Sequence, residues 1–335
     1  MLPAIFSLTG TTLSDAERGL FRDSDPAGFI LFRRNLTDPG QLRALTADLR
    51  ALAGRDDLPI LIDQEGGRVV RLRPPHWPSF PAAEAFARLY EKAPISAIEA
   101  ARLNGEALGA MLADVGINVD CAPVLDLRLP GVDDVVGDRS FGAEPMQVAA
   151  LGRATLDGLA AAGVAGCIKH IPGHGRARVD SHKELPVVRA GRDELSLDFA
   201  PFRALTAAPI GMTAHIVYTE IDPDRPATQS PTVIEEVIRG EIGFDGLLLT
   251  DDIEMEALSG PVAERALLSL EAGCDLALHC SGRIEEMESL AESLGSIGEA
   301  ARTRLDRALA SIAGKSSPAT AEALAGKRDA LLAYA

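Results

Sequence analysis

Eight short apolar runs recur along this chain at intervals averaging about forty residues, and no other feature restricts its fold as strongly. They occupy residues 4–8, 28–32, 59–62, 117–121, 164–168, 209–213, 246–249 and 274–278. Runs this apolar are typical of parallel strands, because helices cover both faces of a parallel sheet. A repeat of about forty residues holds one strand, one helix and their loops. The pattern therefore predicts an α/β fold, the (β/α)8 or TIM barrel.

Helical patterns fill the segments between these runs. Asp38 and Pro39 form a capping start, after which leucines at positions 42, 45, 49 and 52 line one face of a helix. Ser230 and Pro231 open another helix, which Gly243 ends. A doubly wound open sheet is the alternative fold, but it concentrates its chemistry at one switch point. Here polar clusters follow most of the strands, which favours the barrel.

The chain is expected to form one domain over residues 1–335. No linker rich in Pro or Ser interrupts the first 280 residues, and their composition does not change abruptly. The Ala-rich tail from about residue 283 is expected to hold the last barrel helix and one extra terminal helix.

Charge and composition exclude several classes of protein. The formal net charge is −16, so the chain lacks the net basic character that nucleic-acid binders need. No stretch is long and apolar enough for insertion into a membrane, and the N-terminus lacks a signal-peptide pattern. The four cysteines lie in apolar runs, which predicts free thiols in a reducing compartment, the cytoplasm. Nothing in the sequence indicates an oligomeric state.

Ionisable residues follow five of the eight runs, at the end of each strand where a barrel enzyme carries its active site. They are Asp63 and Glu65 after the third run, Asp126 after the fourth, Lys169 and His170 after the fifth, His215 after the sixth, and Asp251 and Asp252 after the seventh. A single strand-end aspartate is often a helix cap, and a single histidine is often a packing residue. Convergence of so many at one mouth predicts an active site.

The segment KHIPGHGRARVDSH, residues 169–182, has the composition of a catalytic loop. Its proline and glycines rule out a helix, so its histidines four residues apart are not the helical zinc pair of a metalloprotease. The glycines suit a loop that moves over a substrate. Asp180 can hold His182 in one tautomer, and an oriented imidazole donates and accepts protons near neutral pH.

Asp251, at the end of the seventh run, is the expected anionic partner of that loop. A carboxylate there can attack an electrophilic carbon or stabilise a cationic transition state. One aspartate of the pair Asp251 and Asp252 can instead cap the next helix. We expect Asp252 to have the lesser role, but the spacing alone does not decide.

These motifs resemble glycoside hydrolase family 3, specifically its single-barrel bacterial β-N-acetylglucosaminidases (β-hexosaminidases) of peptidoglycan recycling. The matching segments are IDQEGGRVVRL from residue 62, VVGDRSFG from 135, KHIPGHGRARVDSH from 169, AHIVYTEIDPDRPATQSP from 214 and GFDGLLLTDDIEMEAL from 243. The pattern KHxPGHG with a downstream DSH is specific to the N-acetylglucosaminidase branch, whereas the segment with Asp251 is shared across the wider family.

The resemblance implies a role for each matching residue. Asp251 resembles the nucleophile that forms a covalent glycosyl-enzyme, and His182, oriented by Asp180, resembles the acid/base. The residues that resemble sugar contacts are Asp63, Arg71, Arg139, Lys169 and His170. The implied activity is retaining exo-hydrolysis of terminal β-linked N-acetylglucosamine from anhydromuramoyl sugars or muropeptides, with no metal and no cofactor. One departure is Glu254, where the family usually has a small or Ser-like residue, and it bears on aglycone preference.

Four other functions stay open: a metal-dependent TIM-barrel hydrolase, a related exo-β-glucosidase, a sugar-binding barrel without turnover, and a protein-interaction scaffold. The metal-dependent class commonly has an HxH pair after the first strand, whereas here that strand is followed by Thr9 and Gly10. A pure binder has no need for Asp251 together with the pair Asp180 and His182.

Two compositional features indicate the kind of substrate. Basic residues gather near the predicted mouth, which suits a substrate that carries carboxylates; they are Arg34, Arg68, Arg71, Arg73, Arg139, Lys169, Arg176, Arg178 and Lys183. Aromatic residues are only 4% of the chain, with one Trp and three Tyr. A polymer cleft lined with stacking rings is therefore not expected, and a pocket for one terminal sugar is favoured.

Overall fold

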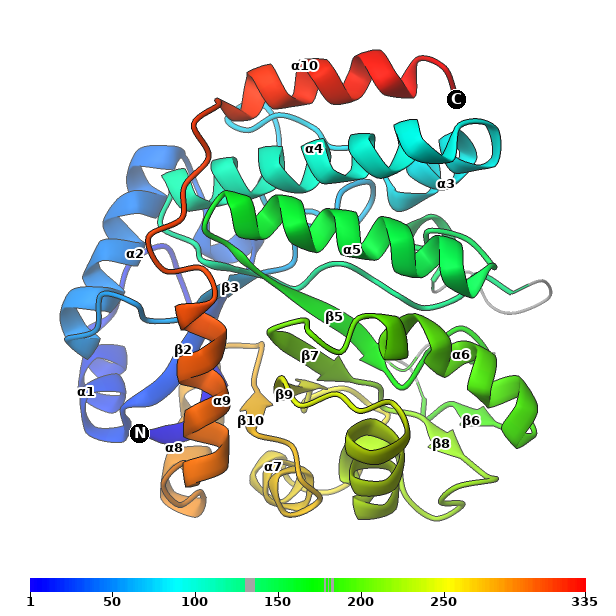
Figure 1. Cartoon of the computed structure of the whole chain (residues 1–335). Coiled ribbons are helices and arrows are strands. Elements are labelled where there is room, and N and C mark those ends of the chain that lie inside the picture. Colours follow the sequence, from blue (N-terminus) through cyan, green and yellow to red (C-terminus); the bar gives the residue numbers. More distant parts are fainter. Residues whose placement is uncertain (130–135, 178, 180, 182–183) are drawn as a thin grey trace.

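Eight parallel strands close into a barrel in this computed structural model, with helices packed around it (Figure 1). The barrel strands are β1 (Leu2–Phe6), β2 (Pro26–Leu31), β3 (Ile60–Ile62), β4 (Val119–Asp120), β5 (Ala165–Ile171), β7 (Ile210–Thr213), β9 (Leu247–Asp252) and β10 (Leu276–Leu278). Hydrogen bonds join them in the order β1-β10-β9-β7-β5-β4-β3-β2. Every apolar run of the sequence contributes one of these strands, which confirms the predicted (β/α)8 barrel.

The structure describes residues 1–129, 136–177, 179, 181 and 184–335. Within these ranges, no helix combines the length and the apolar character that crossing a bilayer requires. All four cysteines are free, as expected, and three of them are buried.

One helix of the outer layer follows each barrel strand. In chain order these are α1 (Asp15–Ser24), α2 (Pro39–Ala53), α4 (Pro94–Asp114), α5 (Pro145–Ala161), α6 (Arg192–Ala204), η4 (Val233–Glu241), α7 (Val262–Glu271) and α8 (Ile284–Ser293), and α3 (Ala83–Lys92) precedes α4. The helix predicted between Ser230 and Gly243 is present as η4, but its hydrogen bonds have π-helical spacing.

Helix α2 shows how the sequence determines these elements. The Asp38 carboxylate accepts the backbone N–H groups of Gly40 and Gln41 at 2.8 and 3.0 Å, so it caps the first turn. Leucines 42, 45 and 49 are at most 3% exposed against the barrel, whereas Leu52 is only half-buried. Gly54 ends the helix with φ = +63°, a conformation that favours glycine.

The barrel interior is filled by side chains that alternate along the strands, among them Ile5, Val119 and Leu247. The helix α9 (Glu299–Ala310) completes this core, because Leu305 and Leu309 pack against the same cluster. Salt bridges from α9 reach residues that precede β9 and β10, so α9 covers the N-terminal end of the barrel. The C-terminal ends of the strands remain open for a site.

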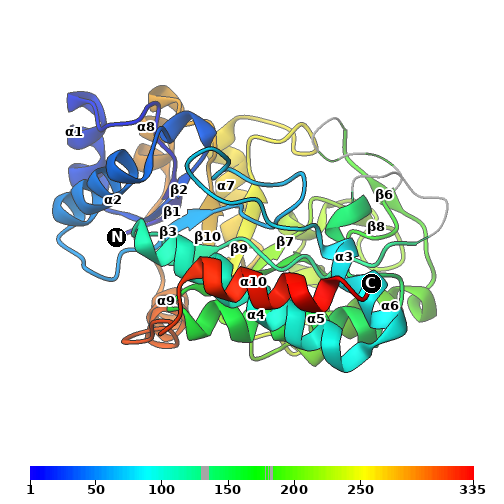
Figure 2. The same ribbon diagram turned by 90° about the horizontal axis from the view of Figure 1, so that it is seen from above.

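The C-terminal segment differs from the prediction. It holds α8, α9 and a further helix, α10 (Ala321–Leu332), so two helices rather than one follow the last barrel helix. Figures 1 and 2 show α10 lying along α4 on the outside of the barrel. Arg328 of α10 is 4% exposed; it donates to Asn104 Oδ1 at 2.9 Å and lies over the Phe80 ring.

Sequence patterns also missed a small second sheet, which pairs β6 (Val187–Val188) with β8 (Val217–Tyr218). Two residues per strand are too few for a recognisable alternation. The sheet lies beside the loop that follows β5, because the Tyr218 hydroxyl donates to the Gly173 carbonyl at 2.7 Å.

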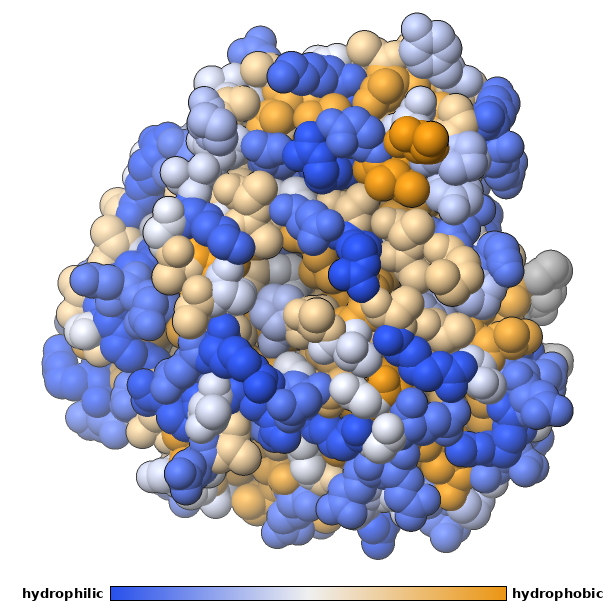
Figure 3. All heavy atoms as spheres, in the orientation of Figure 1, coloured by the Kyte–Doolittle hydropathy of each residue, from blue (hydrophilic) through white to orange (hydrophobic). Residues whose placement is uncertain are grey.

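Hydrophilic side chains are spread over the face of the molecule seen in Figure 3, with smaller apolar patches between them.

Candidate active site

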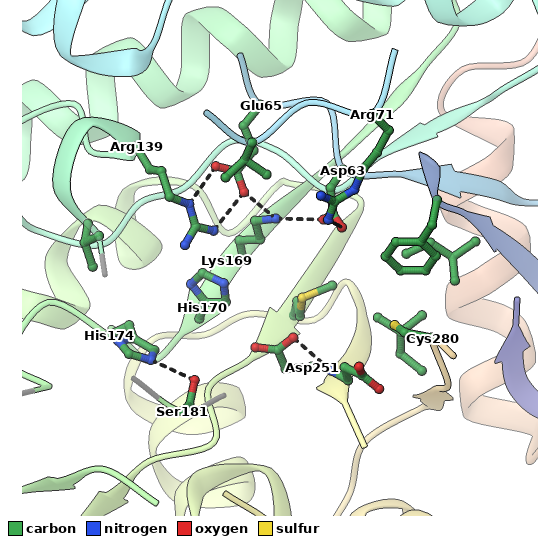
Figure 4. Close-up of a pocket in the computed structure, with 17 residues that line it drawn as sticks. Asp63, Glu65, Arg71, Arg139, Lys169, His170, His174, Ser181, Asp251 and Cys280 are labelled. Carbon is green, nitrogen blue, oxygen red and sulfur yellow. Dashed lines mark hydrogen bonds and ion pairs between the residues drawn. The ribbon is translucent and has the colours of Figure 1, made fainter. Parts of the chain in front are cut away.

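The C-terminal ends of the barrel strands surround a cavity of about 290 Å³ (Figure 4). The predicted site residues that line it are Asp63, Arg71, Arg139, Lys169, His170 and Asp251. The predicted pair Asp180 and His182 lies outside the described residues, and their neighbour Ser181 lines the cavity. The volume is at the lower end of the range for ligand pockets, which begins at about 300 Å³, and suits a small ligand.

Five charged side chains form a chain of ion pairs across one wall of this cavity (Figure 4). Arg71 Nη2 lies 2.8 Å from Asp63 Oδ2, and Asp63 Oδ1 lies 3.1 Å from Lys169 Nζ. Lys169 Nζ lies 2.7 Å from Glu65 Oε1. Arg139 binds both oxygens of Glu65 at 2.8 Å, the bidentate geometry of a strong pair. Among the described residues, three cations meet two anions along this wall.

This pairing keeps all of the wall's groups ionised. Burial alone would raise the pKa of Asp63, but Lys169 and Arg71 hold it well below its usual range. In the same way, Arg139 and Lys169 outweigh burial and lower the pKa of Glu65 to about 2. Burial would lower the pKa of Lys169, whereas its two carboxylate partners raise it. Fixed charges of this kind can bind polar groups of a substrate without first reorganising.

The loop after β3 brings Arg71 back onto Asp63. Gln64 closes this loop, because its side-chain oxygen accepts the backbone N–H groups of Arg71 and Leu72 at 2.8 and 3.0 Å. Gly66 has φ = +101°, and a Cβ there would collide with the Pro81 carbonyl oxygen. The tight turn therefore requires glycine at this position.

Lys169 and His170 lie within the end of β5 rather than after it, because β5 extends to Ile171. His170 Nδ1 lies 2.6 Å from Asp126 Oδ2, so the ring is held by a buried carboxylate. Burial would raise the pKa of Asp126, but His170 lowers it to about 2, and the carboxylate is ionised.

Two more of the described histidines, His174 and His215, lie near the site, and burial lowers the pKa of each. Burial lowers the pKa of His174 to about 4, and its Nε2 lies 3.4 Å from the Ser181 hydroxyl. Burial also lowers the pKa of His215. His215 lies outside the lining of the cavity; its Nε2 donates to the Asp252 carbonyl at 2.9 Å, while Nδ1 bonds the Thr228 hydroxyl at 2.7 Å. His215 thus supports the strand end that carries Asp251 and Asp252.

Asp251 and Asp252 are the last two residues of β9. Burial would raise the pKa of Asp251, but His170 and His215 lower it, so its carboxylate is ionised. Its Oδ1 accepts the Asp252 N–H at 2.8 Å. Burial raises the pKa of Asp252 to about 7, and the neighbouring carboxylates of Glu254 and Asp251 add to this effect. The two adjacent acids are therefore chemically different, and Asp251 is the better nucleophile at neutral pH.

One cluster outside the cavity has the composition of a metal site. The ligand atoms of Glu254, His279 and Glu286 lie within 4.8 Å of one another. Arg283, however, pairs with both carboxylates at 3.0 and 2.8 Å and supplies positive charge there. Glu254 also accepts two consecutive backbone N–H groups after β10. Glu254, the residue that departs from the family motif, thus connects the loop after β9 to the loop after β10.

The predicted cationic rim is only partly present. Of its members, Arg71, Arg139 and Lys169 line the cavity, whereas Arg178 and Lys183 lie outside the described residues. Arg176 is turned away, because it pairs with Glu194 and Asp198 of α6 at 3.1 and 2.6 Å. Arg34 lies over the ring of Phe32, 4.9 Å from its centroid, and Phe32 is the aromatic side chain among the described residues that line the cavity.

Sequence reasoning placed Glu65 at the predicted mouth without a specific role and assigned no role to His174 or Ser181, yet all three line the cavity. Glu65 belongs to the same strand-end segment as Asp63, and this was a usable indication. Its bridging position between Lys169 and Arg139 depends on side chains that arrive from two other strand ends, which spacing does not reveal.

Comparisons with known proteins identify the family of this chain. The model of the glycosyl hydrolase family 3 N-terminal domain matches residues 6–314. A beta-hexosaminidase of Bordetella avium (strain 197N) is 40% identical over 284 residues, which are 83% of this chain and 80% of that protein. A family 3 beta-N-acetylglucosaminidase structure from Paenibacillus sp. is 36% identical with a TM-score of 0.82, and covers 98% of this chain and 61% of that one.

A second solved structure is NagZ from Neisseria gonorrhoeae in complex with N-trifluoroacetyl-D-glucosamine. It is 33% identical, has a TM-score of 0.85, and covers 99% of this chain and 96% of that chain. The family model spans well over half of the sequence, and the similarity to solved relatives extends over the barrel and its open end. This chain therefore belongs to glycosyl hydrolase family 3 and is a glycoside hydrolase.

Proposed function

We propose that this chain is a retaining, exo-acting β-N-acetylglucosaminidase that removes terminal β-linked N-acetylglucosamine from anhydromuramoyl sugars or muropeptides. The observation that carries the proposal is the Asp251 carboxylate, ionised at the edge of a cavity of about 290 Å³ whose opposite wall is a chain of fixed charges. Relatives at about 40% identity bear the name beta-hexosaminidase, and one similar structure holds an N-acylated glucosamine derivative.

In the proposed reaction, Asp251 Oδ attacks the anomeric carbon as the glycosidic bond breaks. The leaving oxygen takes a proton from His182, which Asp180 orients, and the sugar is bound to Asp251 as an ester. Water then attacks the same carbon and gives a proton to His182, and the Asp251 carboxylate leaves. Asp63, Arg71, Arg139, Lys169 and His170 hold the sugar hydroxyl groups in both steps. The reaction needs neither a metal nor a cofactor.

The anhydromuramoyl or peptide portion of the substrate is proposed from charge. Among the described residues of that wall, the cations Arg71, Lys169 and Arg139 outnumber the carboxylates, and Arg71 has a side chain 27% exposed at the cavity. A substrate with lactyl or peptide carboxylates would be attracted to it. We place the enzyme in the cytoplasm on the strength of its four free cysteines.

The first test compares kcat/KM for an aryl β-N-acetylglucosaminide and the matching aryl β-glucoside. We expect strong preference for the former, and a preference for the glucoside would favour the exo-β-glucosidase alternative. Asp251→Asn should remove turnover while N-acetylglucosamine still binds. A wild-type protein that binds the sugar without cleaving it would contradict the proposal and support a sugar-binding barrel.

Retention and metal independence are tested separately. The first product detected by NMR should be the β-anomer, and a slow fluorinated substrate should leave its sugar mass on the peptide that contains Asp251. Loss of activity with a chelator, restored by zinc, would instead favour the metal-dependent hydrolase.

A further inference from the structure

Asp126 is a buried carboxylate that directs both oxygens at two histidines of the site, although it is not among the residues that line the cavity. It has no exposed surface and lies in the stretch after β4. Its Oδ1 accepts the backbone N–H groups of His170 and His174, at 3.2 and 2.6 Å. Its Oδ2 lies 2.6 Å from His170 Nδ1. One side chain thus holds an imidazole ring and two points of the backbone.

The first consequence concerns the tautomer of His170. An ionised carboxylate only accepts hydrogen bonds, so Nδ1 must carry a proton to make this contact. The ring atom that remains for a ligand is then Nε2. His170 lines the same cavity as Asp251, and Figure 4 shows its ring between Lys169 and His174. Asp126 therefore sets the tautomer of His170 and leaves Nε2 as the ring nitrogen that can meet a sugar hydroxyl.

The second consequence concerns the loop that starts after β5. Its first residues are fixed to the strand end of β4, because Asp126 holds the His174 N–H and a Cβ on Gly175 would collide with the Leu127 carbonyl oxygen. Tyr218 binds the Gly173 carbonyl from the other side. The residues proposed as acid/base follow this anchored root along the chain.

We propose that Asp126 is a positioning residue: it keeps the proton of His170 on Nδ1 and anchors the root of the loop that carries Asp180 and His182. This inference rests on the proposed function. The alternative is a carboxylate that only stabilises the fold. The positioning role and the structural role differ in measurable ways. If Asp126 only stabilises the fold, its loss should lower stability but leave the His170 tautomer and the dependence of the kinetic constants on the substrate unchanged.

The test uses the full-length chain and its Asp126→Asn variant. Asparagine keeps one oxygen for the two backbone N–H groups, but its amide group can only donate toward His170 Nδ1. The ring proton should then move to Nε2, which NMR of ring-labelled histidine detects. We expect kcat/KM to fall roughly 100-fold or more, since the same change at the orienting aspartate of a serine protease costs about 10⁴-fold.

A series of aryl leaving groups separates the two effects. A rise in KM that is the same for every leaving group reports on His170. A fall in kcat that shrinks for dinitrophenyl, compared with methylumbelliferyl, reports on the acid/base loop, because a good leaving group needs little proton donation. If both KM and kcat keep their wild-type values with every leaving group, Asp126 is not a positioning residue.

Asp275→Asn is the matched control. Asp275 is also buried and also accepts a backbone N–H, from Leu248 at 2.8 Å, but it precedes β10 at the other end of the barrel. The Asp275→Asn change should lower stability, but it should change neither the position of the His170 ring proton nor the dependence of kcat and KM on the leaving group. The wild-type spectrum needs no variant: an Nδ1 without a proton would overturn the inference even if Asp126→Asn failed to fold. An inactive wild type would contradict the proposed function instead.

Discussion

Glu65 is the residue on which the charged wall most depends, because its carboxylate partners both Lys169 and Arg139 in a buried setting. Glu65→Gln keeps the shape but leaves two cations with one fewer anion. We expect a loss of about 3–5 kcal/mol of unfolding free energy, measured by denaturant titration. Glu84→Gln is the control, since Glu84 also pairs with two arginines, but at the surface.

The control should cost about 0–1 kcal/mol. Equal losses of unfolding free energy in the Glu65 and Glu84 variants would contradict the prediction, because they would show that burial does not increase the cost of removing the Glu65 charge.

Asp252 gives a pH-dependent prediction. Its pKa is raised from about 3.9 in an unfolded chain to about 7 by burial, so folding takes up a proton between these values. Its contribution to stability is full below about pH 4 and is lost as the pH rises to about 7. Asp252→Asn removes this loss. At pH 8 the free energy of unfolding of the variant should therefore exceed that of the wild type by an amount on the order of 2–4 kcal/mol.

The measurement is thermal unfolding of both proteins at pH 4.5, 6 and 8. The difference in Tm should widen from the first pH to the last, and a constant difference would contradict a raised pKa for Asp252.

At the level of residues, the rule that barrel enzymes carry their chemistry at strand ends was enough to name Asp63, Lys169 and Asp251, all of which line the cavity. The same rule missed the difference between Asp251 and Asp252. That difference arises from burial and the nearby Glu254 charge, which raise the pKa of Asp252, and from His170 and His215, which lower the pKa of Asp251. Burial and the two histidines come from elements remote in sequence, so no local pattern contains them.

Among the elements, α9 makes the clearest prediction. Leu305 is 2% exposed and packs into the cluster that fills the barrel. Leu305→Ala should lower the unfolding free energy by about 2–5 kcal/mol, because it leaves a cavity in a close-packed core. KM and kcat should be unchanged, since α9 covers the end of the barrel opposite the site. Asp306→Ala, at an exposed position of the same helix, should have little effect on either quantity.

The elements that sequence could predict are those with a local period. Apolar runs identified every barrel strand, and a cap with a leucine stripe identified α2. The role of α9 as part of the barrel core was not predictable. The spacing of its apolar residues predicts a buried face, but it does not indicate which part of the molecule that face packs against. The π-helical bonding of η4 was missed for a similar reason, since the amphipathic pattern alone does not distinguish it from an α-helix.

For the whole molecule, we expect residues 1–335 to unfold in one cooperative transition. The family model ends at residue 314, yet Arg328 of α10 is buried against Asn104 and Phe80 of the barrel domain. Calorimetry should therefore show a single peak, with Arg328→Ala shifting that peak to lower temperature. A second, separate transition would mean that the C-terminal helix forms its own unit.

The floor of the cavity is the upper layer of the barrel core, because Ile30, Met212 and Leu278 belong to both, and α9 fills the far end. Among the described residues, this floor closes the cavity from below, so substrate, water and products pass through the open end of the barrel. In the proposed reaction the aglycone lies nearest that open end and must depart before water can reach the glycosyl-enzyme. Free N-acetylglucosamine then leaves last, so it competes with new substrate for the empty enzyme, and product accumulation slows turnover at its first step.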